Sequence, residues 1–91
     1  MAIRKCGRVK ISCTYREREN DYRCVFSVNG KKQGVEYVGV PRSLSHAVDS
    51  PQAYSDAAKA AISFAVNDGK LDESDLEWGD SGPRLMRPKR R

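Results

Sequence analysis

The Asn29-Gly30 pair is the feature that most constrains the fold of this 91-residue chain. Asn followed by Gly most readily adopts the two positive φ angles of a type I′ turn, which joins neighbouring antiparallel strands. The pair lies between residues 22–28 and residues 34–40, two segments rich in the β-branched and aromatic residues that strands favour. The sequence therefore predicts a β-hairpin centred on this turn.

A two-residue turn also sets the pairing of the two strands, because Val28 then lies opposite Lys31. Counting outward gives three further predicted pairs: Cys24 with Val35, Tyr22 with Tyr37, and Arg23 with Glu36. The first two pairs would share the buried face of the sheet. The third would form an opposite-charge pair on the other face.

Another strand is predicted over residues 8–15, where side chains alternate with period two. One side would carry Val9, Ile11, Cys13 and Tyr15, and the other Arg8, Lys10, Ser12 and Thr14. The second set is a basic, hydroxyl-rich row that we expect to face solvent.

A helix is predicted to begin at Ser50-Pro51, an N-cap followed by proline at the first helical position. It should end at Asn67-Asp68-Gly69. Between these limits alanines recur at helical spacing together with Tyr54, Ile62 and Phe64, which predicts a narrow stripe packed closely on the sheet.

Residues 70–83 are acidic but contain Leu71, Leu76 and Trp78, which we expect to close the edge of the core. A calcium loop beginning at Asp68 is rejected, because its sixth position is Glu73 rather than glycine.

These elements predict an α+β domain over residues 1–83, followed by a basic tail over residues 84–91. The domain would have a three- to four-stranded antiparallel sheet with one helix packed on one face, in β-β-β-α-β order.

Charge is distributed in three blocks. Residues 1–48 carry ten Lys/Arg and four Asp/Glu, residues 49–83 carry two and eight, and residues 84–91 carry five and none. The domain should therefore be bipolar and nearly neutral, with the excess of the net +5 charge in the tail. The placement of charge thus says more about partners than the overall isoelectric point does.

The sequence gives little support for catalysis, a metal or a cofactor. Cys6, Cys13 and Cys24 have spacings that match neither a redox pair nor a zinc site, and we expect reduced thiols with Cys13 and Cys24 in the core. The lone His46 is expected on the surface. No glycine loop precedes a helix.

Two further expectations concern location. No apolar run is long enough to span a bilayer, and the basic N-terminus has no apolar segment behind it. We therefore expect a cytoplasmic protein that does not enter membranes.

The first functional hypothesis is a non-enzymatic module that contacts the phosphates of DNA or RNA without reading sequence. Base stacking is not expected, because Tyr15, Tyr22, Phe26 and Tyr37 fall on the predicted buried face. The expected contact residues lie on the first strand, the hairpin tip and the tail: Arg8, Lys10, Lys31, Lys32, Arg84, Arg87, Lys89, Arg90 and Arg91.

The second hypothesis is a small protein that binds and blocks another protein, such as part of a nucleic-acid-handling complex. The near-neutral, bipolar body would offer complementary faces, and the tail could dock in an acidic groove.

The order of the predicted elements resembles two families. One is the double-stranded-RNA-binding fold without its first helix, and the other is the HicB-like antitoxin fold. The former binds RNA with a basic cluster that opens its last helix, whereas this helix opens Pro51-Gln52-Ala53-Tyr54-Ser55-Asp56. We therefore do not expect this chain to bind RNA through the start of its helix, as that family does.

The segment from Ser50-Pro51 through Asn67-Asp68-Gly69, followed by Trp78 and Gly82-Pro83, also resembles small phage proteins. Inhibitors of host or defence machinery, anti-CRISPR proteins among them, belong to that group. This resemblance implies the alternative function of a phage-encoded protein inhibitor.

Overall fold

The Asn29-Gly30 turn forms as predicted in the computed structural model, which describes residues 2–44, 46–80 and 82–86. The two φ angles are 52° and 80°. They join β3 (Asp21–Val28) to the antiparallel β4 (Lys31–Gly39). Val28 lies opposite Lys31, so the predicted pairing is confirmed next to the turn.

Further from the turn, the predicted pairing is wrong by one residue. Ser27 lies opposite Lys32 but Phe26 lies opposite Gly34, which leaves Gln33 without a partner in β3. An extra residue of this kind is a β-bulge. Because side chains alternate with period two, the bulge moves every later side chain of β4 to the other face.

The bulge exchanges the surroundings of Glu36 and Tyr37. Glu36, predicted to face solvent opposite Arg23, lies opposite Cys24 on the buried side and is only 8% exposed. Tyr37, predicted to be buried, lies opposite Arg23 and is 50% exposed. Val35 likewise turns away from Cys24 to the side that the helix does not cover.

Gly34 explains why the bulge is placed where it is. A Cβ at this position would lie 3.0 Å from Cδ of Lys70, whose side chain passes over the strand to reach Glu36. Glycine within a strand often marks a bulge or a close approach of this kind.

The sheet contains one strand that was not predicted, β1 (Ala2–Cys6), which pairs antiparallel with β2 (Val9–Arg16). The tight turn between them needs Gly7, because its φ is 59° and a Cβ there would lie 2.5 Å from the carbonyl oxygen of Asp75. A residue other than glycine would be strained and would collide with the backbone at Asp75.

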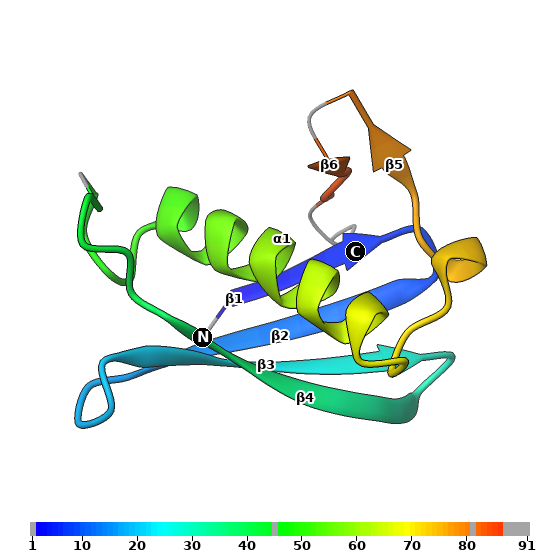
Figure 1. The fold of residues 1–91 in the computed structure, drawn as a ribbon, viewed down its shortest axis with the longest axis horizontal. Helices are drawn as coiled ribbons and strands as arrows, with labels where there is room; N and C mark the ends of the chain where they lie inside the picture. The colour runs from blue at the N-terminus through cyan, green and yellow to red at the C-terminus, as the bar shows by residue number, and fades with distance from the viewer. Residues whose placement is uncertain (1, 45, 81, 87–91) are drawn as a thin grey trace, which may run out of the picture.

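The four strands form an antiparallel sheet in the order β1-β2-β3-β4, and α1 (Pro51–Asn67) packs on one face of it (Figure 1). The α+β class with one helix on an antiparallel sheet is thus confirmed. The fourth strand of this sheet is β1. After the helix come a short 3₁₀ turn, η1 (Glu73–Asp75), and a separate two-stranded ladder of β5 (Trp78–Gly79) and β6 (Gly82–Pro83).

The helix begins and ends as predicted. Ser50 is the N-cap, and its Oγ accepts a hydrogen bond of 3.2 Å from the backbone N–H of Ala53. At the other end, Gly69 has a φ of 74°, and the backbone N–H of Lys70 donates to the carbonyl of Ala65. No helix in the described ranges is long and apolar enough to cross a membrane.

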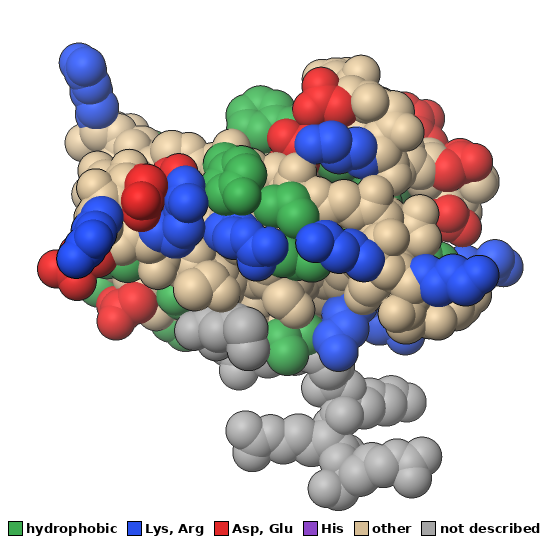
Figure 2. Space-filling model, turned by 90° about the horizontal axis from the view of Figure 1, so that it is seen from below, with side chains coloured by type: hydrophobic (Ala, Val, Ile, Leu, Met, Phe, Trp, Pro, Cys, Tyr) green, Lys and Arg blue, Asp and Glu red, His purple; other side chains and the backbone are tan. Residues whose placement is uncertain are grey.

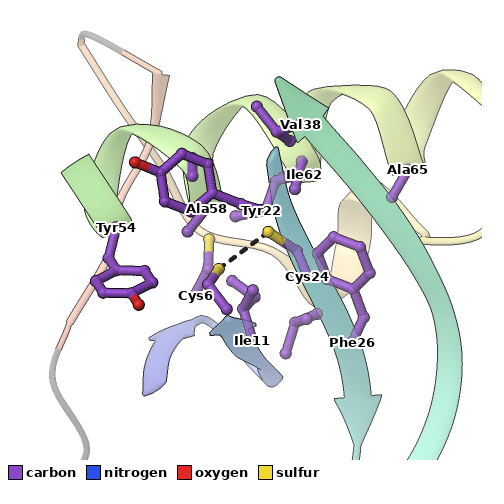
Figure 3. Packing of buried hydrophobic residues seen from close by; sticks show 14 of the residues in the cluster. Cys6, Ile11, Tyr22, Cys24, Phe26, Val38, Tyr54, Ala58, Ile62 and Ala65 are labelled. Atoms are coloured by element: carbon purple, nitrogen blue, oxygen red, sulfur yellow. Dashed lines mark hydrogen bonds between the residues drawn. The ribbon is translucent and has the colours of Figure 1, made fainter. Parts of the chain in front are cut away.

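The core lies between the sheet and α1 (Figure 3). It is formed by buried side chains of the strands, all three cysteines among them, by the alanine-rich face of the helix and by one leucine after it: Cys6, Val9, Ile11, Cys13, Tyr22, Cys24, Phe26, Val38, Ala53, Tyr54, Ala57, Ala58, Ala61, Ile62, Ala65 and Leu71. The predicted burial of Cys13 and Cys24 is confirmed. Phe64 was predicted in this core but is 45% exposed, because it lies beside the alanine stripe rather than on it.

The segment after the helix closes one end of the core. Leu71 is buried and Leu76 is half-buried, as predicted, but Trp78 is exposed. The backbone N–H of Arg8 donates to the carbonyl of Asp75 at 2.8 Å. Lys5 and Met86 exchange two backbone hydrogen bonds of 2.7 Å, so the chain after β6 pairs with the free edge of β1.

Candidate nucleic-acid interface

The face of the main sheet that points away from α1 is called the outer face below. The strand pairing assigns it these side chains: Ile3, Lys5, Lys10, Ser12, Thr14, Arg16, Asp21, Arg23, Val25, Ser27, Lys32, Val35 and Tyr37. In the described part of the chain, α1, β5 and β6 lie on the opposite side, and η1 lies at the end of the sheet beside the turn between β1 and β2 (Figure 1). The outer face is therefore open to a partner.

One cross-strand row of the outer face carries three lysines. Lys5 lies opposite Lys10, Lys10 opposite Ser27, and Ser27 opposite Lys32, so this basic row crosses all four strands. All three lysines are exposed, and no described carboxylate lies within 4.0 Å of their ammonium groups. Like charges directly opposite each other destabilise a sheet. Lys5 and Lys10 therefore repel each other in the free chain, and an anionic partner would relieve this repulsion.

The next row along the strands is mainly apolar. Ile3, Ser12, Val25 and Val35 lie across β1 to β4 and are half-buried. The row after that holds Thr14, Arg23 and Tyr37 on β2, β3 and β4. The outer face thus combines an apolar centre with cations on both sides of it.

Arg16, Asp21 and Tyr37 form the most tightly held cluster on this face. Nε and Nη2 of Arg16 donate to the two carboxylate oxygens of Asp21 at 2.7 and 2.6 Å. The same guanidinium lies over the Tyr37 ring, with Cζ 4.6 Å from the ring centroid. Its hydrogen bonds with Asp21 raise the pKa of Arg16 and lower that of Asp21.

The charge of the outer face differs from that of the opposite side. Asp21 is its sole carboxylate, against five lysines and arginines. Figure 2, seen from the sheet side, shows basic side chains in a band across the face with hydrophobic ones between them. The acids of residues 72–80 belong to η1, β5 and their flanks, in the segment that follows the helix in the chain.

The structure brings some of the predicted contact residues together. Lys10 and Lys32 both lie in the basic row. Arg8, in the turn before β2, and Lys31, at the start of β4, are exposed at the same end of the sheet, although Lys31 is on the helix-facing side. Arg84 is elsewhere, after β6, where its Nη1 lies 3.5 Å from Oε1 of Glu77.

The remaining predicted contacts, Arg87, Lys89, Arg90 and Arg91, lie outside the described residues. Their role stays a prediction.

Lys5, Arg23 and Tyr37 were not among the predicted contact residues, although Arg23 was correctly predicted to lie on this face. Lys5 was missed because β1 was not recognised, although Gly7 before the alternation of β2 was a turn signal. Arg23 was expected beside Glu36, and Tyr37 inside the core, because the bulge was not foreseen. Gly34 was the signal that could have revealed it.

The groups that could support catalysis do not converge in the described part of the chain. His46 is exposed and lines a surface depression with Arg4, Gln52 and Asp56. The three cysteines are buried in the core instead. No group of three or more His, Cys, Asp or Glu residues suited to a metal was found among the described residues.

Cys13 and Cys24 lie directly opposite each other on β2 and β3, with their sulfur atoms 3.1 Å apart. The hydrogen bond between the two thiols raises the pKa of Cys24 and lowers that of Cys13, while burial raises both. Cys24 is therefore a poor nucleophile at neutral pH, and Cys13 is buried in the core, away from any substrate.

Compared with protein-family models, curated proteins and solved structures, the chain gives no match.

Proposed function

We propose that this chain is a non-enzymatic binding module that contacts nucleic acid through the outer face of its sheet. The basic row carries the proposal. Three exposed lysines lie in one cross-strand row, on β1, β2 and β4, and no carboxylate of the described residues lies within 4.0 Å of their ammonium groups. Cations in this arrangement are suited to the regularly spaced phosphates of a nucleic-acid backbone.

The surroundings of the basic row support the same reading. Ser12, Thr14 and Ser27 on the same face offer hydroxyl groups that can also bond phosphate oxygens. Arg8 and Lys31 add exposed charge at the end of the sheet where the row lies. These groups hold a backbone without distinguishing bases, so binding should depend little on sequence.

The test measures the affinity of a fluorescently labelled oligonucleotide, as a single strand and as a duplex, at low salt. The row variant replaces Lys5, Lys10 and Lys32 by Gln. It should bind both forms more weakly than the natural chain, because it releases fewer counterions from the nucleic acid.

A matched control variant replaces Arg18, Arg42 and Lys59 by Gln. These three residues lie in the turn between β2 and β3, on the loop before α1 and on α1, and none belongs to the outer face. The control variant loses the same net charge as the row variant but should keep most of the affinity.

Equal loss of affinity in the two variants would mean that net charge alone explains the weaker binding, and it would contradict a site on the outer face. A protein that the natural chain retains after nuclease treatment, and that the row variant releases, would assign the outer face to a protein partner instead. That result would favour the inhibitor hypothesis.

A further inference from the structure

Tyr37 is an exposed aromatic residue of the outer face, outside the basic row. It lies opposite Arg23 and is 50% exposed, in a strand whose alternate residues, Glu36 and Val38, are buried. An exposed ring on an uncovered sheet costs free energy that contact with a partner would recover. A planar partner could stack on the part of the ring that the protein leaves uncovered.

The ring is held in place before any partner arrives. The guanidinium of Arg16 stacks on it, and the bidentate hydrogen bonds with Asp21 fix that guanidinium in turn. Pre-ordering of contact groups lowers the entropy cost of binding. The Arg16–Tyr37 stack also presents two kinds of group on which nucleobases stack, an aromatic ring and an arginine plane.

The ring continues into apolar surface. Val25 and Val35 form the adjacent row of the outer face, two residues along their strands from Arg23 and Tyr37. Beyond them, a further two residues along β3, lies Ser27 of the basic row. The basic row thus lies on one side of this apolar region, and Arg23 and Arg16 lie on the other side.

From this arrangement, and on the basis of the function proposed above, we propose that the outer face takes nucleic acid as a single strand. At least one base would stack on Tyr37 and extend over Val25 and Val35. The sugar-phosphate backbone would run along the basic row and Arg23. The same surface suits a duplex less well, because duplex bases stack on one another and turn only their edges outward, and an open sheet face does not enter a groove.

The experiment compares four proteins: the natural chain, Tyr37→Ala, Tyr37→Phe and Phe64→Ala. Phe64 is the matched control, since it is 45% exposed but lies on α1, away from the outer face. Each protein is titrated against labelled oligo(dT), oligo(U) and a mixed-sequence duplex of the same length.

The natural chain should bind the single strands more tightly than the duplex. Loss of one stacked base should weaken single-strand binding of Tyr37→Ala by about 5- to 150-fold and leave duplex binding unchanged. Tyr37→Phe keeps the ring and should bind like the natural chain, as should Phe64→Ala. A strand that contains 5-iodouracil should photo-crosslink to Tyr37.

Two results would overturn the inference, and they differ in what they leave standing. Unchanged single-strand affinity in Tyr37→Ala, with weaker binding in the row variant, would mean that the outer face contacts phosphates alone, so the proposed function would stand. Failure of the natural chain to bind either form would reject both proposals.

Discussion

Glu36 of β4 and Lys70, just after α1, form an ion pair in which Lys70 Nζ lies 2.9 Å from Glu36 Oε2. The geometry is that of an ion pair rather than a directed hydrogen bond, since Oε2 is buried and has no hydrogen-bond partner. One of the three N–H groups of the Lys70 ammonium donates to the carbonyl of Val35 at 2.8 Å. The pair joins the edge strand of the sheet to the end of the helix.

Lys70→Ala should therefore destabilise the fold by about 1 to 3 kcal/mol, because it leaves the Glu36 carboxylate buried without its counter-charge. The free energy of unfolding in urea measures the effect. The double variant Glu36→Val/Lys70→Met should recover much of the loss, since apolar residues can replace a buried pair. A double variant less stable than Lys70→Ala would contradict this account.

The two phenylalanines, buried Phe26 and half-exposed Phe64, should differ sharply in their contribution to the free energy of unfolding. Phe26→Ala should cost about 3 to 5 kcal/mol, because the side chain is fully buried between sheet and helix. Phe64→Ala should cost about 1 kcal/mol or less. Urea denaturation of the two variants checks the difference, and similar losses would mean that Phe64 belongs to the core after all.

The cysteines should behave as buried, reduced thiols. Cys6, Cys13 and Cys24 are at most 1% exposed, so a thiol reagent should label none of them in the folded chain and all of them in denaturant. Reductant or a metal chelator should leave the melting temperature unchanged. If denatured, non-reduced protein shows one thiol instead of three, Cys13 and Cys24 have formed a disulfide and the expectation is wrong.

The secondary structure could be predicted from the sequence where a few neighbouring residues determine it. Asn29-Gly30 needs positive φ angles, and Ser50-Pro51 satisfies the first turn of a helix, so both elements followed from a few adjacent residues. The pairing beyond Gln33 did not, because the close approach of Lys70 to Gly34 beside the bulge brings together residues that are far apart in the sequence. Tyr37 and Val35 were placed on the wrong face for that reason, whereas Lys5 was missed because β1 was not predicted.

The Arg16–Asp21 pair should make the free energy of unfolding depend on pH in the acidic range. Arg16 lowers the pKa of Asp21 in the folded chain below its ordinary value of 3.8. The carboxylate therefore contributes stability that is present above that value and is lost as the pH falls through the lower, folded value. Asp21→Asn should accordingly be less stable than the natural chain at neutral pH, and the difference should shrink in this acidic range. A difference that persists unchanged below the folded value would contradict the assignment.

The salt dependence of single-strand binding tests the central claim most directly. For the natural chain, the row variant and the control variant, log K is measured against log salt concentration with oligo(dT). Each phosphate neutralised on a single strand contributes about 0.7 to the slope, so the row variant should lose up to about 2.1. The control variant should keep the slope of the natural chain. A slope that is unchanged in the row variant, or that falls equally in both variants, would contradict a nucleic-acid site on the outer face.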